Sequence, residues 1–214
     1  MGTRSGLESF YRLTDADTFR ASKAMADAFG EDPLWRKIFE GERDLQRRYQ
    51  ACFEVPIRHC LRFGEVHATS EALEGVVATV PGERSTMSLR TMLRSGALGA
   101  GLRMGATASK RMADLKILDS DRKRHTAGRT YSYLLILGVR SAHQGKGLGA
   151  SLLRGLIERC DSEQLPIYLE TETENNVALY RHFGFEVVQH LTLEKLGLPM
   201  WEMMREPGAD TGSK

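Results

Sequence analysis

The strongest chemical signal in the sequence is a turn that carries three glycines at alternate positions. The turn consists of Gln144, Gly145, Lys146, Gly147, Leu148, Gly149 and Ala150. Glycine tolerates positive φ and has no β-carbon, so successive backbone N–H groups can converge on one anion. A helix that begins at such a turn adds about half a positive charge at its N-terminus. The turn is therefore typical of a site that binds a phosphate or pyrophosphate group.

Two other interpretations of the turn remain open, and a third is excluded. Gly145, Gly147 and Ala150 also match the dinucleotide-binding pattern G-x-G-x-x-A, with Glu170 placed 20 residues later as a ribose-binding acid. That pattern expects its first glycine almost directly after a strand, whereas five residues beginning at Arg140 intervene here. A glycine turn without any ligand is the second alternative. A Walker A loop is excluded, because Arg140 stands where that loop requires its first glycine.

A second pair of polar residues, Asn176 and Tyr180, stands four positions apart in a segment with helical periodicity. Residues at this spacing lie one above the other on a helix, so an amide and a phenol could contact one extended ligand. The alternative is that Tyr180 packs in the core with Val177 and Phe183.

Neither covalent catalysis nor metal binding has support in the sequence. Cys52, Cys60 and Cys160 are an odd number without C-x-x-C or Cys/His spacing, which indicates reduced thiols and predicts no metal site. These cysteines, together with Ser132 and Ser141, also lack the spacing of a nucleophile with its base.

The turn and the chain that follows it resemble the acyl-CoA loop of the GNAT superfamily of N-acetyltransferases. Residues 139–150 fit the pattern V-x-x-x-x-Q/R-G-x-G-x-G/A, although Ser141 stands where many members have proline. Residues 169–185 are similar to the family segment L-E-x…N-x-x-x-Y-x-x-x-G-F. Within the superfamily the chain most resembles puromycin N-acetyltransferase and its bacterial relatives, through Trp201 and the Arg-Glu-Pro-Gly run at 205–208.

This resemblance implies that the protein transfers the acetyl group of acetyl-CoA directly to a primary amine of a small molecule. It implies that the backbone of residues 144–150 binds the coenzyme A pyrophosphate and that Asn176 bonds the pantetheine arm. It also implies that Tyr180 donates a proton to the departing thiolate, which is feasible because a phenol has a pKa of about 10 and a thiol about 8.5. Backbone N–H groups at the end of the preceding strand would stabilise the oxyanion. These belong to the segment Leu137, Gly138 and Val139.

A general base is also required, because an alkyl amine is mostly protonated at neutral pH. The resemblance places Glu170 at the end of the strand beside the thioester, so Glu170 is the candidate. Its alternative role is to orient the ammonium group of the substrate. Glu172, Glu31, Asp32 and the histidines remain open as bases.

The elements that must position these groups follow from periodicity and turn signals. Helices are predicted over residues 17–29, after Pro33 and over 44–63, followed by a β-hairpin over 64–82. The glycine-rich segment 83–129 predicts a mobile helix pair; its basic run at 122–124 is interpreted as a solvated helix face. Strands and helices then alternate, with strands at 131–139, 167–170, 185–193 and 200–205 and helices at 147–160 and 174–182.

The resemblance implies an α/β (α+β) fold of one domain, in which a mixed sheet flanked by helices splays around acetyl-CoA. The domain is expected over residues 10–206, with flexible tails at 1–9 and 207–214. Two alternatives in function stay open, namely a non-catalytic CoA-binding regulatory domain and a nicotinamide-dependent oxidoreductase.

Composition limits the partners. With 214 residues, 41% hydrophobic and 27% charged, the chain has the composition of a globular domain. A formal net charge of +2 is too balanced for a protein whose main partner is nucleic acid. No apolar run approaches the roughly 20 residues that a membrane span needs, so no membrane partner is expected. Because residues 1–9 lack the apolar segment of a secretory signal, a cytoplasmic location is expected. Neither the acceptor amine nor the oligomeric state can be predicted.

Overall fold

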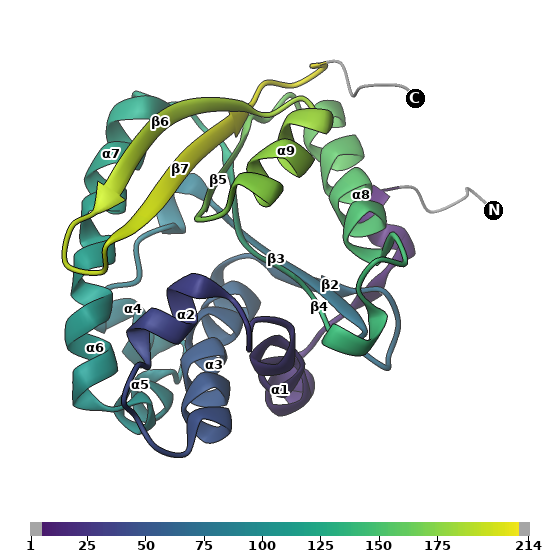
Figure 1. Cartoon of the computed structure of the whole chain (residues 1–214). Helices are drawn as coiled ribbons and strands as arrows, with labels where there is room; N and C mark the ends of the chain where they lie inside the picture. Colours follow the sequence, from purple (N-terminus) through teal and green to yellow (C-terminus); the bar gives the residue numbers. More distant parts are fainter. Residues whose placement is uncertain (1–5, 210–214) are drawn as a thin grey trace.

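The computed structural model describes residues 6–209 and contains one seven-stranded mixed sheet in the order β1-β2-β3-β4-β5-β7-β6 (Figure 1). The strands are β1 Tyr11–Arg12, β2 Glu65–Ala68, β3 Gly75–Pro81, β4 Ser132–Val139, β5 Ile167–Thr171, β6 Glu186–Leu193 and β7 Leu198–Arg205. Only β4 and β5 pair in parallel, and all other neighbours are antiparallel. The predicted mixed α/β fold is confirmed; the short strand β1 was not predicted.

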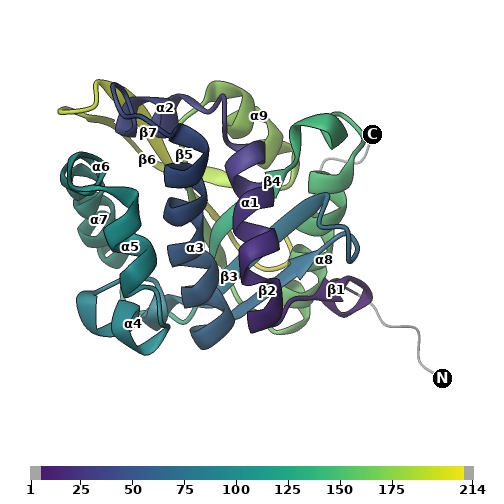
Figure 2. The same ribbon diagram turned by 90° about the horizontal axis from the view of Figure 1, so that it is seen from below.

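Helices cover both faces of this sheet. They are α1 Thr18–Ala28, α2 Pro33–Ile38, α3 Leu45–Phe63, α8 Leu148–Ser162 and α9 Glu174–His182, close to the predicted bounds. Along β3, Val77 belongs to the core beneath α8, whereas Val76 and Ala78 belong to the core shared with α1 and α3. Figure 2 shows α1 and α3 lying across β2 and β3. Because both faces are covered, the central strands are apolar on both sides.

The glycine-rich segment does not form the predicted helix pair. It contains four short α-helices, which are α4 Leu89–Arg94, α5 Leu98–Met104, α6 Ala106–Met112 and α7 Lys116–Thr126. Gly96 and Gly105 have φ of +70° and +102°, and such values cannot continue a right-handed helix. The prediction of two helices was wrong because single glycines were treated as tolerated inside a helix rather than as its end.

The parallel pair β4 and β5 is hydrogen-bonded only at its beginning. The register joins Ser132 to Ile167 and Tyr133 to Tyr168 and then stops. Beyond that point β4 continues beside β3, and β5 continues beside β7, so the strands diverge into a V (Figure 1). The β3–β4 register shifts between Ala78 and Thr79, which leaves Leu135 as an extra residue of β4. A bulge of this kind bends its strand and increases the local twist, which accounts for the divergence.

The ends of the described chain are anchored. Residues 1–5 and 210–214 of the predicted tails lie outside the described part. Residues 6–9, however, form a 3-10 helix that buries Leu7 against α8. The backbone N–H of Gly208 donates to Asp161 at 2.9 Å, and Arg205 donates to the carbonyl of Ala209. An apolar side chain and a carboxylate therefore hold residues 6–9 and 207–209 against the rest of the domain.

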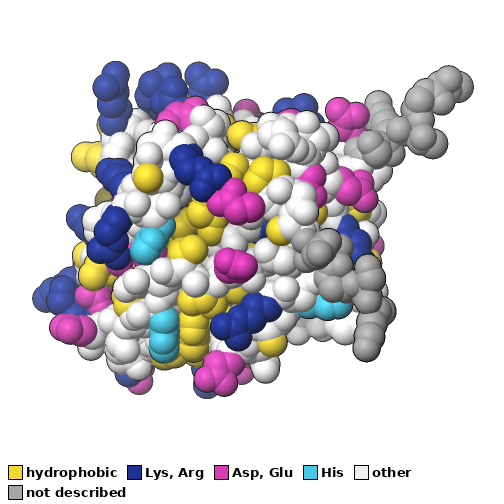
Figure 3. Space-filling model, turned by 90° about the horizontal axis from the view of Figure 1, so that it is seen from above, with side chains coloured by type: hydrophobic (Ala, Val, Ile, Leu, Met, Phe, Trp, Pro, Cys, Tyr) yellow, Lys and Arg dark blue, Asp and Glu magenta, His cyan; other side chains and the backbone are white. Residues whose placement is uncertain are grey.

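The outer strand β6 is only half buried. Seen from above the view of Figure 1, hydrophobic side chains gather in a band with charged side chains of both signs around it (Figure 3). Such a mixed face is not the basic surface that a phosphate backbone requires.

Within residues 6–209, no helix combines the length and apolar character that crossing a membrane requires.

Candidate active site

The glycine turn connects the end of β4 to α8. Gly145 and Gly147 have φ of +74° and +77°, the left-handed region that glycine reaches without cost. The turn is held at its base by two contacts. The backbone N–H of Ser141 donates to the Asp27 carboxylate at 2.9 Å, and Gln144 Nε2 donates to the Val139 carbonyl at 3.0 Å.

The backbone N–H groups of this turn are free to bind a ligand. Within residues 6–209, no acceptor receives a hydrogen bond from the N–H groups of residues 145–150; the first helical donor of α8 is Ser151, which bonds Gly147. Gln144 to Gly147 are exposed. Unpaired donors at a helix N-terminus are groups that can bind an anion such as a diphosphate.

The end of β4 directs further donors into the gap between β4 and β5. The N–H of Arg140 donates to the Glu74 carbonyl on the β3 side at 2.8 Å. Because backbone groups alternate along a strand, the N–H groups of Leu137 and Val139 face the opposite side, which β5 has left. Gly138 does not face this gap with its backbone. A β-carbon there would lie 2.7 Å from Met25 Sδ, so Gly138 permits the close packing of α1.

Helix α9 presents Asn176 and Tyr180 on one face. Thr173 caps the helix, and Asn176 Nδ2 donates to Thr171 Oγ1 at 3.0 Å. The Tyr180 ring is 9% exposed and packs against Phe185 with ring centroids 5.5 Å apart. Its hydroxyl makes no hydrogen bond with another described residue. Burial raises the pKa of Tyr180, and the nearby Glu172 charge raises it further, so the phenol keeps its proton at neutral pH.

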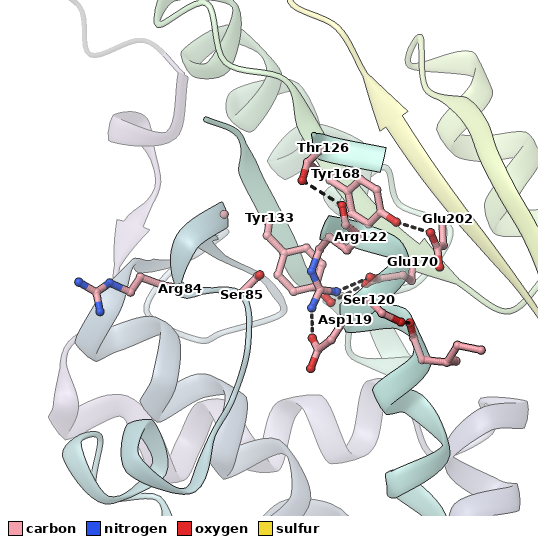
Figure 4. A network of polar contacts seen from close by, with 12 residues as sticks. Arg84, Ser85, Asp119, Ser120, Arg122, Thr126, Tyr133, Tyr168, Glu170 and Glu202 are labelled. Carbon is pink, nitrogen blue, oxygen red and sulfur yellow. Dashed lines mark hydrogen bonds and ion pairs between the residues drawn. The ribbon is translucent and has the colours of Figure 1, made fainter. Parts of the chain in front are cut away.

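Glu170 lies in a polar network that the sequence did not predict (Figure 4). Arg122 Nη1 donates to one oxygen of Glu170, and the Tyr133 hydroxyl donates to the other. Arg122 also pairs with Asp119, and its guanidinium lies 4.3 Å from the centre of the Tyr133 ring. Burial raises the pKa of Glu170, whereas the Arg122 charge and the Tyr133 hydrogen bond oppose that rise. Arg122 is 3% exposed, so the interpretation of residues 122–124 as a solvated face was wrong for Arg122.

A second buried acid extends this network. Glu202 on β7 is the cross-strand partner of Glu170, and it accepts a hydrogen bond of 2.5 Å from the Tyr168 hydroxyl. Glu202 is fully buried, and burial raises its pKa to about 7. His125 Nε2 of α7 lies 3.7 Å from its carboxylate. The network therefore joins α7 to β4, β5 and β7. Its polar groups lie on strands that the sequence pattern predicted to be apolar.

A different pair of carboxyl groups, Glu172 and Asp32, meets just beyond β5. Burial raises the pKa of Glu172 to about 9, and both a hydrogen bond to Asp32 and the Asp32 charge contribute. Asp32 caps α2, because its Oδ1 accepts from the N–H groups of Leu34 and Trp35 at 3.0 and 3.2 Å. Within residues 6–209, neither acid has a cationic partner. Glu172 therefore keeps its proton at neutral pH, and an incoming ammonium would compensate the charge that develops on this pair.

The family comparison matches the part of the chain that carries these features. The model of the acetyltransferase (GNAT) family matches residues 112–185, which include the strand gap, the glycine turn, β5 and α9. This segment of the chain therefore resembles the GNAT acetyltransferases. An uncharacterized N-acetyltransferase of Schizosaccharomyces pombe is 28% identical over 209 residues, which cover 94% of this chain and 84% of that protein.

Several solved structures of acetyltransferases share the fold of this chain. A Corynebacterium glutamicum structure described as histone acetyltransferase HPA2 and related acetyltransferase has a TM-score of 0.64 at 20% identity and covers 97% of this chain and 99% of its own. A structure described as a putative arylalkylamine N-acetyltransferase 7 of the yellow fever mosquito has a TM-score of 0.66 at 14% identity. The match covers 91% of this chain and 85% of the mosquito chain. A Drosophila melanogaster polyamine N-acetyltransferase that forms N-acetylagmatine has a TM-score of 0.61 at 14% identity. The match covers 92% of this chain and 98% of the Drosophila chain.

The fold also argues against one alternative function, the nicotinamide-dependent oxidoreductase. A nicotinamide-binding domain has a doubly wound, mostly parallel sheet, whereas here β4 and β5 are the only parallel neighbours among the described strands. The surroundings of the candidate acids narrow the choice of general base. Glu170 already pairs with Arg122, whereas Glu172 and Asp32 have no cationic partner among residues 6–209.

Proposed function

We propose that this protein is a GNAT acetyltransferase and transfers the acetyl group of acetyl-CoA to a primary amine of a small molecule. The observation that carries the proposal is the combination of free turn N–H groups, a strand gap lined by further N–H groups, and an uncompensated carboxyl pair beyond the end of β5. The first two suit an anionic thioester cofactor, and the third suits a cationic amine.

In this proposal the cofactor supplies the activated acetyl group, and the chain holds it through residues of three elements. The residues are Gln144, Gly145, Lys146, Gly147, Leu148, Gly149 and Ala150 at the diphosphate, Asn176 at the pantetheine arm, and Leu137, Gly138 and Val139 near the carbonyl. Of the last three, the N–H groups of Leu137 and Val139 face the gap and would stabilise an oxyanion. Gly138 contributes by letting α1 approach the strand.

We propose that Asp32 and Glu172 receive the ammonium group and accept its proton. Burial and the neighbouring Asp32 charge raise the pKa of Glu172 to about 9, and a cation between the two acids relieves their repulsion. Glu172 is then ionised and can accept a proton from the amine before it attacks. Glu170 has the lesser role of holding Arg122 and α7 beside the site, because its charge is already compensated.

Tyr180 is proposed as the proton donor to the departing thiolate. Its raised pKa keeps the phenol protonated over the working pH range, and its hydroxyl has no competing partner within the described residues. The pKa of a thiol, about 8.5, lies below that of the phenol, so the transfer must be favoured by position in the site rather than by acidity alone.

The acceptor is proposed to be a small amine, a class that includes the arylalkylamines and agmatine of the similar structures. The likeness to puromycin N-acetyltransferase, the domain bounds 10–206 and a cytoplasmic location remain predictions. Each depends on the acceptor or on the cell rather than on the geometry of the site.

Calorimetry with acetyl-CoA, followed by thiol release with a panel of small amines, tests the proposal. Gly147→Ala forces a β-carbon to positive φ in the turn and should weaken acetyl-CoA binding about tenfold or more. Gly128→Ala is the matched control, because Gly128 has φ of +75° and equally open space but follows α7 at the other end of β4. Absence of acetyl-CoA binding, or equal weakening by both variants, would reject the cofactor site.

A further inference from the structure

Three arginines converge on one aromatic ring at the end of α3. The guanidinium carbons of Arg62, Arg84 and Arg94 lie 6.0, 5.8 and 5.7 Å from the centre of the Phe63 ring. The three come from separate segments, namely α3, the 3-10 helix Gly82–Arg84 and α4. Attraction of each cation to the ring accounts for part of this arrangement, but the three like charges also repel one another.

This repulsion is not compensated by acids of the chain. Among residues 6–209, no carboxylate forms an ion pair with any of the three arginines. Glu54, on the same helix as Arg62, already pairs with Arg58 and Arg103. The cluster differs in this respect from Arg122, which has two carboxylates around it.

The backbone beneath the cluster is fixed. His59 is 1% exposed, and burial lowers its pKa, so the ring is neutral and its Nε2–H donates to the Arg84 carbonyl at 2.6 Å. Gly64, which follows Phe63, touches β3 so closely that a β-carbon would lie 2.1 Å from the Thr79 carbonyl oxygen. Phe63 and Arg84 are therefore both tied to the same end of the sheet.

The cluster is separate from the proposed cofactor site. Gly75 at the start of β3 pairs with Val139 beside the glycine turn, whereas Pro81 at its end pairs with Ser132. Seven strand residues at about 3.3 Å each place these ends roughly 20 Å apart. Figure 4 shows Arg84 extending away from the Arg122 network. The glycine turn and the arginine cluster cannot bind the same phosphate group.

We propose that Arg62, Arg84 and Arg94 form a binding site for a phosphate monoester dianion above Phe63. Guanidinium groups donate hydrogen bonds in a planar fork that matches phosphate oxygens, and a doubly charged anion offsets the repulsion of three cations better than a single carboxylate. The phosphate can belong to a free metabolite or to a lipid headgroup. The second source deserves its own measurement, because Leu89 and Leu93 of α4 are 65% and 58% exposed beside the cluster.

The test is a titration of the full-length protein with inorganic phosphate at low ionic strength, followed by NMR of the arginine Nε–H resonances. The expected result is a saturable shift of the Arg62, Arg84 and Arg94 signals. The double variant Arg62→Gln/Arg94→Gln should weaken that binding by about tenfold or more. Arg47→Gln, an exposed arginine of α3 without an ion pair, is the matched control and should bind as the wild type does.

A parallel sedimentation experiment separates the two sources of phosphate. Binding to vesicles that contain phosphatidic acid, lost in the double variant, would assign a lipid phosphate. Binding of inorganic phosphate with no vesicle binding would assign a soluble one. If the three arginine signals do not move and vesicles are not bound, or if the double variant binds as well as the wild type, the site does not exist. None of these outcomes depends on acetyl-CoA binding, so the test is independent of the proposed function.

Discussion

Glu170 and Glu172 stand two residues apart at the end of one strand, and their surroundings differ in one respect. Glu170 contacts the buried cation Arg122 and the Tyr133 hydroxyl. Glu172 meets another carboxyl group, that of Asp32, and no cation. The first acid is therefore compensated inside the protein, whereas the second depends on a charge that the described chain does not supply.

The difference indicates how a single strand can serve both stability and ligand binding. A buried carboxylate with a permanent cation is part of the framework, because removing either partner leaves an unpaired charge. A carboxyl pair without a cation favours any ammonium group that reaches it. Each prediction below tests one side of this contrast.

The largest effect is expected from Arg122→Met. This change leaves the buried Glu170 and the partly buried Asp119 without their cation and should lower the free energy of unfolding by about 3 to 5 kcal/mol. Chemical denaturation measures it. Arg124→Met, which removes an arginine with a 61% exposed side chain from a pair with Asp121, is the control and should change stability by less than about 1 kcal/mol. Similar losses in the two variants would show that burial does not distinguish the pairs.

Glu172→Gln should have the largest effect on catalysis. Without an acid that can take the amine proton, kcat/KM for the amine should fall about 100-fold to 1000-fold, while the affinity for acetyl-CoA stays unchanged. Glu170→Gln should reduce the rate per folded molecule far less. Steady-state thiol release measures both. The reverse order would return the role of general base to Glu170.

Tyr180→Phe should lower kcat about 10-fold to 100-fold, since only a proton donor is lost. The dissociation constant of acetyl-CoA should remain within about twofold, because the phenyl ring still packs on Phe185. Tyr49→Phe, at a tyrosine that is 4% exposed and packs on Phe39, controls for loss of a buried hydroxyl. An unchanged kcat would remove Tyr180 from the reaction.

The smallest predicted effect concerns stability and pH. The pKa of Glu172 is raised from 4.5 to about 9 in the folded protein, so between these values the folded state keeps a proton that the unfolded state has lost. Stability should therefore fall as pH rises through this range. Glu172→Gln removes the penalty and should raise the free energy of unfolding at pH 8 but change it little at pH 5. Thermal unfolding at both pH values, with exposed Glu174→Gln as control, measures this gain; equal gains at both would contradict it.

The sequence predicts the local parts of the site better than the distant ones. The glycine turn and the pair Asn176 and Tyr180 are defined by neighbours a few residues apart, so their elements could be recognised. Arg122 could not be assigned to Glu170, because the two are 48 positions apart and a basic run usually faces water. Asp32 and Glu172 were open candidates, but only the folded chain brings the two acids together.

The fold shows the same division. Helices with a continuous apolar stripe, such as α3 and α8, were predicted nearly to their ends. Segment 83–129 was not, since its breaks depend on the sign of φ at Gly96 and Gly105, which composition does not reveal. Strand β1 is two residues long and owes its existence to pairing with β2, a contact that no local pattern encodes.

The extra residue at Leu135 has a consequence for how such an enzyme could be inactivated. Without the extra residue, β4 would pair with β3 along its whole length and would lack the bulge that bends it away from β5. The hydrogen-bonded ladder between β4 and β5 could then extend toward Thr171. Such a sheet would have more backbone hydrogen bonds, and it would leave no gap between β4 and β5 for the thioester of the proposed cofactor. The gap between β4 and β5 therefore depends on the number of residues in one strand, and removal of Leu135 should narrow it.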